Sequence, residues 1–290
     1  MALASMSEIF ERMARNGQEF WEVVLADDMD ERQVSREASM AKMLTTWQAM
    51  QDAADSYTGR KRSVSGLVGG DGMKMRQYTF RGCAMTGGYV SEVIAEALSM
   101  AESNACMRRI VAAPTAGACG VLPAVLLPLC KYEELTQHQL LEALYVAAGI
   151  GSVIAYKASI AGASGGCQAE IGTASAMAAG ALVALRGGEG EQIGHAVAMA
   201  LKNLMGLVCD PVAGLVEVPC VKRNAAGAMI AMSSADMALA GIRSAVPPDE
   251  AILAMREVGD KMDVSLKETG VGGVAGTPFG QKIAEKMGMA

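Results

Sequence analysis

The sequence predicts an all-α protein, a single mainly helical domain whose glycine-rich loops converge on one site. Two observations predict this fold class. The chain is 51% hydrophobic but only 4% aromatic, and it holds 22 Met, a composition that favours closely packed helices. Strand and helix patterns do not alternate, which disfavours a doubly wound sheet. We expect one domain over 1–290, with N-terminal helices in 1–60 and a motif-bearing core in 61–290.

Helical segments follow one another from residue 35 onward. Ser35 is placed to cap the first of them. Thr136 is followed three residues later by Gln139, the capping-box pattern. Pro247 and Pro248 are expected to end one helix and to begin the next, because proline suits the first helical turn. The expected helices are 35–57, 88–107, 120–132, 136–157, 168–187, 189–205, 224–243 and 249–262.

Charge and composition exclude several classes of protein. A net charge of −6 argues against a broad nucleic-acid surface. Residues 1–20 are amphipathic and charged without a long apolar region, so we expect no secretory signal and a cytoplasmic protein with reduced thiols. Residues 143–156 are almost uncharged, but this run is shorter than the roughly 20 residues of a membrane span. We therefore expect neither a membrane nor a nucleic acid as partner.

Five loops between the expected helices are rich in glycine and small polar residues, and three of them carry cysteine. Turns of this kind expose backbone N–H groups that can bind anions before a helix N-terminus. For any single loop, a helix stop is the simpler interpretation. Five together favour a shared site. They are 63–72, 113–120, 158–168, 206–224 and 268–280.

Other motifs give weaker indications. Residues 270–275 match G-x-G-x-x-A, but no strand precedes them, so a dinucleotide site is not expected. Lys157 precedes a glycine-rich loop and leaves a pyridoxal phosphate site as the second interpretation. The sequence contains only two histidines, His138 and His195, so it offers few ligands for an ordinary zinc site and few candidates for the base of a Ser-His hydrolase. His195 lies on an expected helix and is interpreted as a packed side chain.

Three cysteines lie in loops that glycine or proline marks: Cys167, Cys209 and Cys220. Three loop thiolates without a clear fourth partner suit an iron–sulfur cluster with one iron left open. On residue chemistry alone, three unrelated reduced thiols explain the pattern equally well.

Five stretches, taken in order, resemble the α chain of bacterial iron–sulfur-dependent L-serine dehydratases: SGLVGGDG, APTAGACGVLPAVL, SGGCQAEIGTASAMAA, GLVCDPVAGLVEVPCVKRNA and GGVAGTPFG. The resemblance implies a [4Fe-4S] cluster held by Cys167, Cys209 and Cys220, with Gly165 and Gly166 letting Cys167 approach it. Cys119 is expected to line the pocket. The remaining three, Cys83, Cys106 and Cys130, are expected to be small apolar side chains.

The resemblance also implies conversion of L-serine to pyruvate and ammonia, with the open iron acting as a Lewis acid toward the serine hydroxyl. Candidate donors to the substrate carboxylate are Ser65, Thr115 and the backbone N–H groups of Gly69 and Gly70. No residue has the pattern of the base that removes the α-proton.

The same resemblance implies partners and leaves two alternatives open. Because the chain matches only the α portion of the family, a separate β subunit and an oligomer are expected. One alternative is a related lyase acting on cysteine or another β-substituted amino acid. The other is a non-catalytic subunit that carries a cluster.

Overall fold

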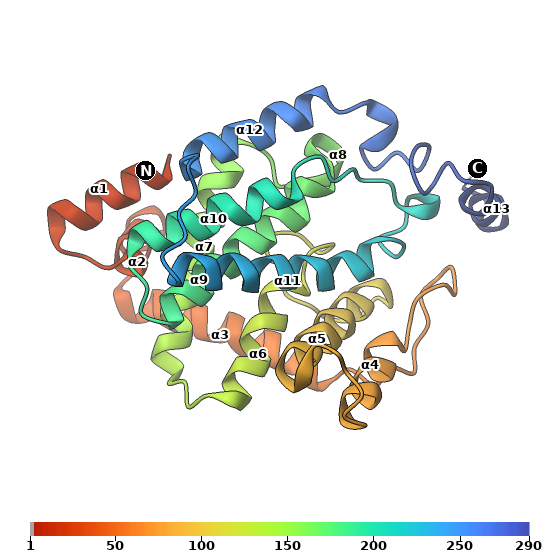
Figure 1. The fold of residues 1–290 in the computed structure, drawn as a ribbon, viewed down its shortest axis with the longest axis horizontal. Coiled ribbons are helices and arrows are strands. Elements are labelled where there is room, and N and C mark those ends of the chain that lie inside the picture. Colours follow the sequence, from red (N-terminus) through yellow and green to blue (C-terminus); the bar gives the residue numbers. More distant parts are fainter. Residues whose placement is uncertain (1–2, 290) are drawn as a thin grey trace.

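The computed structural model describes residues 3–289, and within them it is built from α-helices without a strand (Figure 1). The all-α prediction is confirmed. Two short 3₁₀ turns, a π turn at Gln168–Gly172 and a single bridge between Cys209 and Lys267 complete the backbone. The helices are α1 (Met6–Asn16), α2 (Phe20–Arg32), α3 (Arg36–Asp55), α4 (Asp71–Phe80), α5 (Gly87–Ala105), α6 (Val121–Tyr132), α7 (Gln137–Lys157), α8 (Gly162–Gly165), α9 (Thr173–Leu185), α10 (Gly190–Leu204), α11 (Cys220–Leu239), α12 (Pro248–Lys261) and α13 (Pro278–Met287).

Side-chain caps set two helix starts where the sequence predicts them. Ser35 Oγ accepts a hydrogen bond from the Ala38 backbone N–H at 3.3 Å and begins α3. Thr136 and Gln139 form both halves of the capping box that begins α7. These local predictions are confirmed because each depends on residues within one turn of the helix.

Two boundaries differ from the prediction. Pro248 begins α12, but Pro247 does not end the preceding helix, because α11 already ends at Leu239. In addition, α11 begins at Cys220 rather than at residue 224. Cys220 therefore lies in the first turn of a helix, where backbone N–H groups have no intrahelical partner.

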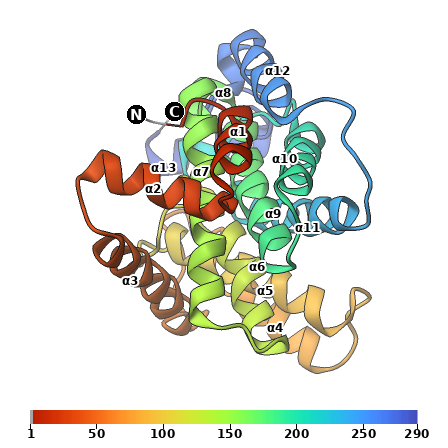
Figure 2. The same cartoon turned by 90° about the vertical axis from the view of Figure 1, so that its left-hand side faces the viewer.

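The core lies around α9, which is enclosed by α6, α7, α10 and α11 (Figure 2). The side chains of α9 are almost all buried and almost all small, so the neighbouring backbones approach closely. A β-carbon added at Gly180 would overlap the end of Ile150 on α7. This core forms a rigid scaffold, and the loops at the ends of its helices carry the site.

The N-terminal helices and the apolar helix α7 belong to the same packing. α2 and α3 both contact α7, and α1 contacts α10 and α12. α7 is long and apolar enough to cross a membrane, but 67% of its most apolar window is buried inside the fold. It is a core helix here. The prediction of a single domain over 1–290 stays a prediction.

Candidate functional site

The three predicted ligand cysteines come from three separate elements. Cys167 directly precedes the π turn, Cys209 lies in the segment that follows α10, and Cys220 is the first residue of α11. All three are buried, with exposed fractions of 2%, 2% and 6%. Segments of π-helix occur often at functional sites because they shift side chains out of the regular helical register.

Contacts of the flanking residues bring the three thiols into one region: the Gln168 N–H donates to the Leu207 carbonyl at 2.9 Å, and Arg223 donates to the Val208 carbonyl at 2.7 Å. Burial and, after it, the charge of Cys167 raise the pKa of Cys220 to about 12. Burial and then the charge of Cys167 likewise raise the pKa of Cys209. For Cys167 itself, burial raises the pKa to about 11 against the opposing charge of Arg223. The three thiols therefore share one region, while their role as ligands stays a prediction.

This donor set fits an iron–sulfur cluster. The cysteines are free, and thiolate sulfur is the ligand that such clusters take. The Arg223 guanidinium beside Cys167 offsets the negative charge that three thiolates would bring. Within residues 3–289, no three His, Cys, Asp or Glu side chains are spaced to hold a single metal ion. A four-iron cluster is wider than one ion, so its thiolates stand further apart.

Two buried amides fix the segments that carry these cysteines. Gln168 Nε2 donates to the Met255 carbonyl at 2.9 Å, and Gln168 Oε1 accepts from the Gly206 N–H at 2.9 Å. Asn224 Nδ2 donates to the Gly117 carbonyl at 2.8 Å, while its Oδ1 accepts from the Gly120 N–H at 2.8 Å. The first amide ties Cys167 to the Cys209 segment, and the second ties the start of α11 to the 113–120 loop.

The Cys209 segment is also bound to the C-terminal loop. The Cys209 N–H donates to the Leu266 carbonyl at 2.8 Å, and the Glu268 N–H donates to the Cys209 carbonyl at 2.7 Å. Next to them, Asp210 accepts from Arg223 at 2.8 Å and from the Val274 N–H at 2.8 Å. Four of the five glycine-rich loops thus meet around the thiols.

The fifth loop, 63–72, reaches the same region through Glu217. Ser63 Oγ donates to Glu217 Oε2 at 2.6 Å, and Ser65 Oγ donates to the same oxygen. Glu217 is buried and lies three residues before Cys220. The Ser65 hydroxyl, which the sequence predicts to bind substrate, therefore donates to the Glu217 carboxylate of the same chain.

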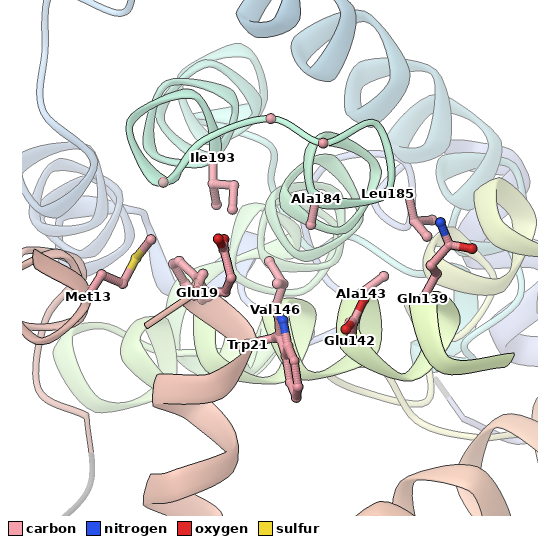
Figure 3. Close-up of a pocket in the computed structure, with 14 residues that line it drawn as sticks. Met13, Glu19, Trp21, Gln139, Glu142, Ala143, Val146, Ala184, Leu185 and Ile193 are labelled. Atoms are coloured by element: carbon pink, nitrogen blue, oxygen red, sulfur yellow. The ribbon is translucent and has the colours of Figure 1, made fainter. Parts of the chain in front are cut away.

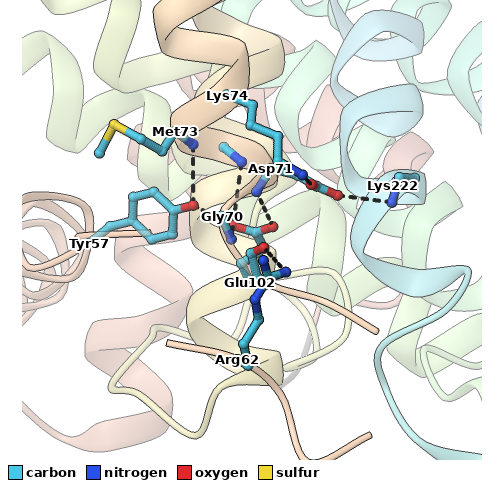
Figure 4. A network of polar contacts seen from close by, with 10 residues as sticks. Tyr57, Arg62, Gly70, Asp71, Met73, Lys74, Glu102 and Lys222 are labelled. Carbon is cyan, nitrogen blue, oxygen red and sulfur yellow. Dashed lines mark hydrogen bonds and ion pairs between the residues drawn. The ribbon is translucent and has the colours of Figure 1, made fainter. Parts of the chain in front are cut away.

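The backbone donors of this loop are likewise held from within, as Figure 4 shows. Glu102 accepts from the N–H groups of Gly70 at 3.1 Å and Asp71 at 2.7 Å, and from the Tyr57 hydroxyl. Burial and the bond to Glu102 raise the pKa of Tyr57, which keeps its hydroxyl protonated as a donor. The anion-binding helix N-terminus expected here exists, and the side chain of Glu102 fills it.

Two glycines of the motifs serve the packing of the backbone. Gly69 has φ +132°, and a β-carbon there would overlap the Lys61 carbonyl oxygen. Gly166 has φ +76°, and its β-carbon would lie 2.6 Å from Met262 Sδ and 3.0 Å from the Leu207 carbonyl oxygen. Replacing Gly69 therefore displaces the loop, so that substitution does not isolate substrate binding.

Thr115 and Glu170 face the thiol region without fixed partners. Thr115 Oγ1 is buried and has no well-aligned hydrogen bond. Burial raises the pKa of the neighbouring Glu170 carboxyl, and the Thr115 hydroxyl opposes that rise. Sequence patterns missed Glu170, because a single glutamate in a helical run has no distinguishing neighbours.

The cleft in Figure 3, of about 360 Å³, lies elsewhere, between α2, α7 and the turn after α9. Its polar side chains already have partners within the chain. Glu19 completes a capping box with Glu22, and Glu142 lies 3.2 Å from His138. No cysteine lines it, so the thiols mark the better candidate site.

Lys157 does not have the surroundings of a pyridoxal phosphate lysine. Its Nζ lies 3.1 Å from Asp249 Oδ1, and that carboxylate also accepts from the Met6 and Ser7 N–H groups. We expect Lys157→Ala to lower the free energy of unfolding by about 1 kcal/mol, because a partly buried ion pair is lost. Turnover of L-serine, the substrate that the resemblance implies, should stay within about twofold under anaerobic conditions, a change smaller than RT, because no group at the thiol site changes. Loss of turnover at normal iron content would contradict this.

Comparison with known proteins decides the family. Residues 15–275 match the family described as "Serine dehydratase alpha chain". The chain belongs to this family. It is 45% identical to the "Probable L-serine dehydratase, alpha chain" of Bacillus subtilis, over 92% of this chain and 89% of that protein. It is 40% identical to the "L-serine dehydratase, alpha chain" of Peptoniphilus asaccharolyticus, over 97% of both. The predicted identity, the α chain of an L-serine dehydratase, is confirmed.

Longer relatives match over a smaller part. The "L-serine dehydratase 2" of Escherichia coli is 44% identical over 62% of this chain, and the match covers 40% of that protein. This serine dehydratase α chain therefore corresponds to one portion of the longer enzymes.

Proposed function

We propose that this α chain binds a [4Fe-4S] cluster through Cys167, Cys209 and Cys220 and dehydrates L-serine at it. The observation that supports the proposal is the meeting of three buried, free thiols from separate segments beside Arg223. An iron without a protein thiolate supplies Lewis-acid chemistry toward the serine hydroxyl, which is otherwise a poor leaving group. The surrounding loops exclude water and orient the substrate.

The substrate carboxylate is proposed to bind beside the 63–72 and 113–120 loops. Thr115 is the best-supported donor, because its hydroxyl is buried and makes no well-aligned hydrogen bond. Ser65 and the Gly70 N–H are bound by Glu217 and Glu102, so either would have to exchange partners to bind substrate. Gly69 shapes the turn that presents them.

A separate β subunit is the proposed partner. The relatives that match over nearly their full length are themselves called alpha chains, whereas the match covers only 40% of the longer Escherichia coli relative. The rest of the enzyme would then come from a second chain, in an oligomer located in the cytoplasm.

Removing the Thr115 hydroxyl tests the carboxylate site. Thr115→Val keeps the shape but leaves the substrate carboxylate without this donor. We expect kcat/KM for L-serine to fall roughly tenfold or more, mostly through KM, because a hydrogen bond to a charged group is lost. Iron content measures cluster retention and should not change. An unchanged KM would argue against Thr115 as a substrate donor.

Anaerobic reconstitution followed by assay with the β subunit tests the function as a whole. The expected result is iron and sulfide bound to the α chain and turnover of L-serine in preference to L-threonine and L-cysteine. Preference for L-cysteine would indicate the related lyase. A loaded complex without turnover of any of the three would indicate a cluster-carrying subunit. Activity that needs pyridoxal phosphate rather than iron would contradict the proposal.

A further inference from the structure

Glu170 is a half-buried carboxylate without a cationic partner. It makes no ion pair with any residue in the described range 3–289, and the Thr115 hydroxyl beside it makes no well-aligned hydrogen bond. Withdrawing a carboxylate from water costs free energy unless a cation or several donors compensate. The structure supplies neither, so a cationic group from outside the chain would compensate the charge of Glu170.

Two glycines pack closely beside the carboxylate. A β-carbon at Gly162 would lie 3.0 Å from Glu170 Oε2 and 2.7 Å from Cys209 Sγ. A β-carbon at Gly117 would lie 3.4 Å from both Glu170 oxygens. The carboxylate and the Cys209 thiol therefore both lie against the Gly162 backbone, and a methyl group at Gly162 would overlap them.

The charges around the Glu170 carboxylate favour a cation. Glu268 is close enough to influence Glu170, and the charge of Glu170 in turn influences all three candidate ligand thiols. The positive group in this region, Arg223, is bound to Asp210 at 2.8 Å and to the Val208 carbonyl at 2.7 Å. Arg223 thus faces Asp210 and Cys167 and forms no ion pair with Glu170.

We propose that Glu170 binds the α-ammonium group of the substrate amino acid. This inference rests on the proposed function, because it places the ammonium beside the thiols that would hold the cluster. In L-serine the ammonium and the hydroxyl are on adjacent carbons, so one end of the molecule at Glu170 brings the other toward Cys209. Glu170 then selects amino acids over hydroxy acids of the same shape.

Glu170→Gln tests this with two ligands that differ only at the α-substituent. L-alanine carries an ammonium there and L-lactate a hydroxyl, and neither has a leaving group. Affinity is measured as thermal stabilisation of the anaerobic, iron-loaded α–β complex. We expect the affinity for L-alanine to fall roughly thirtyfold or more, as for loss of one partner of a buried charge pair. Affinity for L-lactate should stay within about threefold, a change close to RT.

Three variants complete the test. Glu170→Asp keeps the charge and should recover part of the L-alanine affinity. Glu268→Gln removes a neighbouring charge and should shift the L-alanine affinity by less than about threefold, a small rim effect. Gly117→Ala places a methyl group against Glu170 and should raise KM for L-serine about tenfold at unchanged iron content. If Glu170→Gln fails to retain iron, the KM of Gly117→Ala tests the inference in its place.

Several results would overturn the inference. One such result is a wild-type complex with equal affinity for L-lactate and L-alanine. Another is that Glu170→Gln lowers the affinity for both ligands equally, or for neither. An unchanged KM for L-serine in Gly117→Ala would also contradict the inference. Failure of the proposed function is recognised separately, as a wild-type complex that lacks iron or does not turn over L-serine.

Discussion

Replacing Cys209 with alanine is expected to abolish cluster retention and dehydration together. Three thiolates leave no spare protein ligand, and Cys209 lies with Cys167 and Cys220 at the meeting point of the loops. Iron and sulfide per chain should fall to near zero after anaerobic reconstitution, and turnover of L-serine should fall below detection. The folded state should persist, because Cys209 is held by backbone hydrogen bonds to Leu266 and Glu268 that alanine retains.

Cys130→Ala provides the matched control. Cys130 is half-buried in α6 and lies in the cleft between α3, α4, α5 and α6, which contains none of the three candidate ligands. Iron content and turnover should match the original. A Cys209→Ala protein that keeps its iron and its activity would show that another group completes the site.

Replacing Glu102 with alanine is expected to lower the free energy of unfolding by about 3–5 kcal/mol. Glu102 is 1% exposed and accepts from the Tyr57 hydroxyl and from the first N–H groups of α4. Alanine leaves these buried donors without an acceptor, and each unpaired donor carries a desolvation cost. Denaturant unfolding followed by circular dichroism measures the change.

Two variants isolate the cause. Tyr57→Phe removes one donor to Glu102 and the acceptor of the Met73 N–H at 3.3 Å, and should cost about 1–2 kcal/mol. Glu92 lies on the same helix, α5, and makes only a contact with Lys131 at 3.9 Å and a hydrogen bond from Tyr132 at 3.3 Å. Glu92→Ala should therefore lower the free energy of unfolding by less than about 1 kcal/mol. Equal effects of Glu102→Ala and Glu92→Ala would show that the network around Glu102 does not stabilise the loop.

Most of the helices could be predicted from the sequence, because their determinants are local. Ser35, Thr136 and Pro248 each act within one turn of the helix that they begin. α1 and α2 had only a general prediction over 1–60, and α4, α8 and α13 were not predicted as helices. α4 follows a glycine turn and is capped by Glu102 from α5, a partner about thirty positions along the chain that no local pattern reveals.

The cysteines of the candidate site could be named from the sequence, and their role as ligands stays a prediction. Glycine-rich loops with cysteine drew attention to these thiols, although helix stops and unrelated thiols explained the same features. The roles of Glu102 and Glu217 depend on which carboxylate reaches a donor after folding, so their occupation of the 63–72 loop could not be anticipated. Glu170 likewise becomes a candidate site residue only in the folded chain, where Gly117 and Gly162 pack beside it.

The central claim is that three thiolates of this chain hold one cluster. Its most direct test is the amount of iron and acid-labile sulfide bound per α chain after anaerobic reconstitution and removal of excess reagents. The account predicts about four of each per chain, as the composition of a [4Fe-4S] cluster requires. A chain that binds no sulfide, or binds the same amount when Cys167, Cys209 and Cys220 are all replaced, would contradict it.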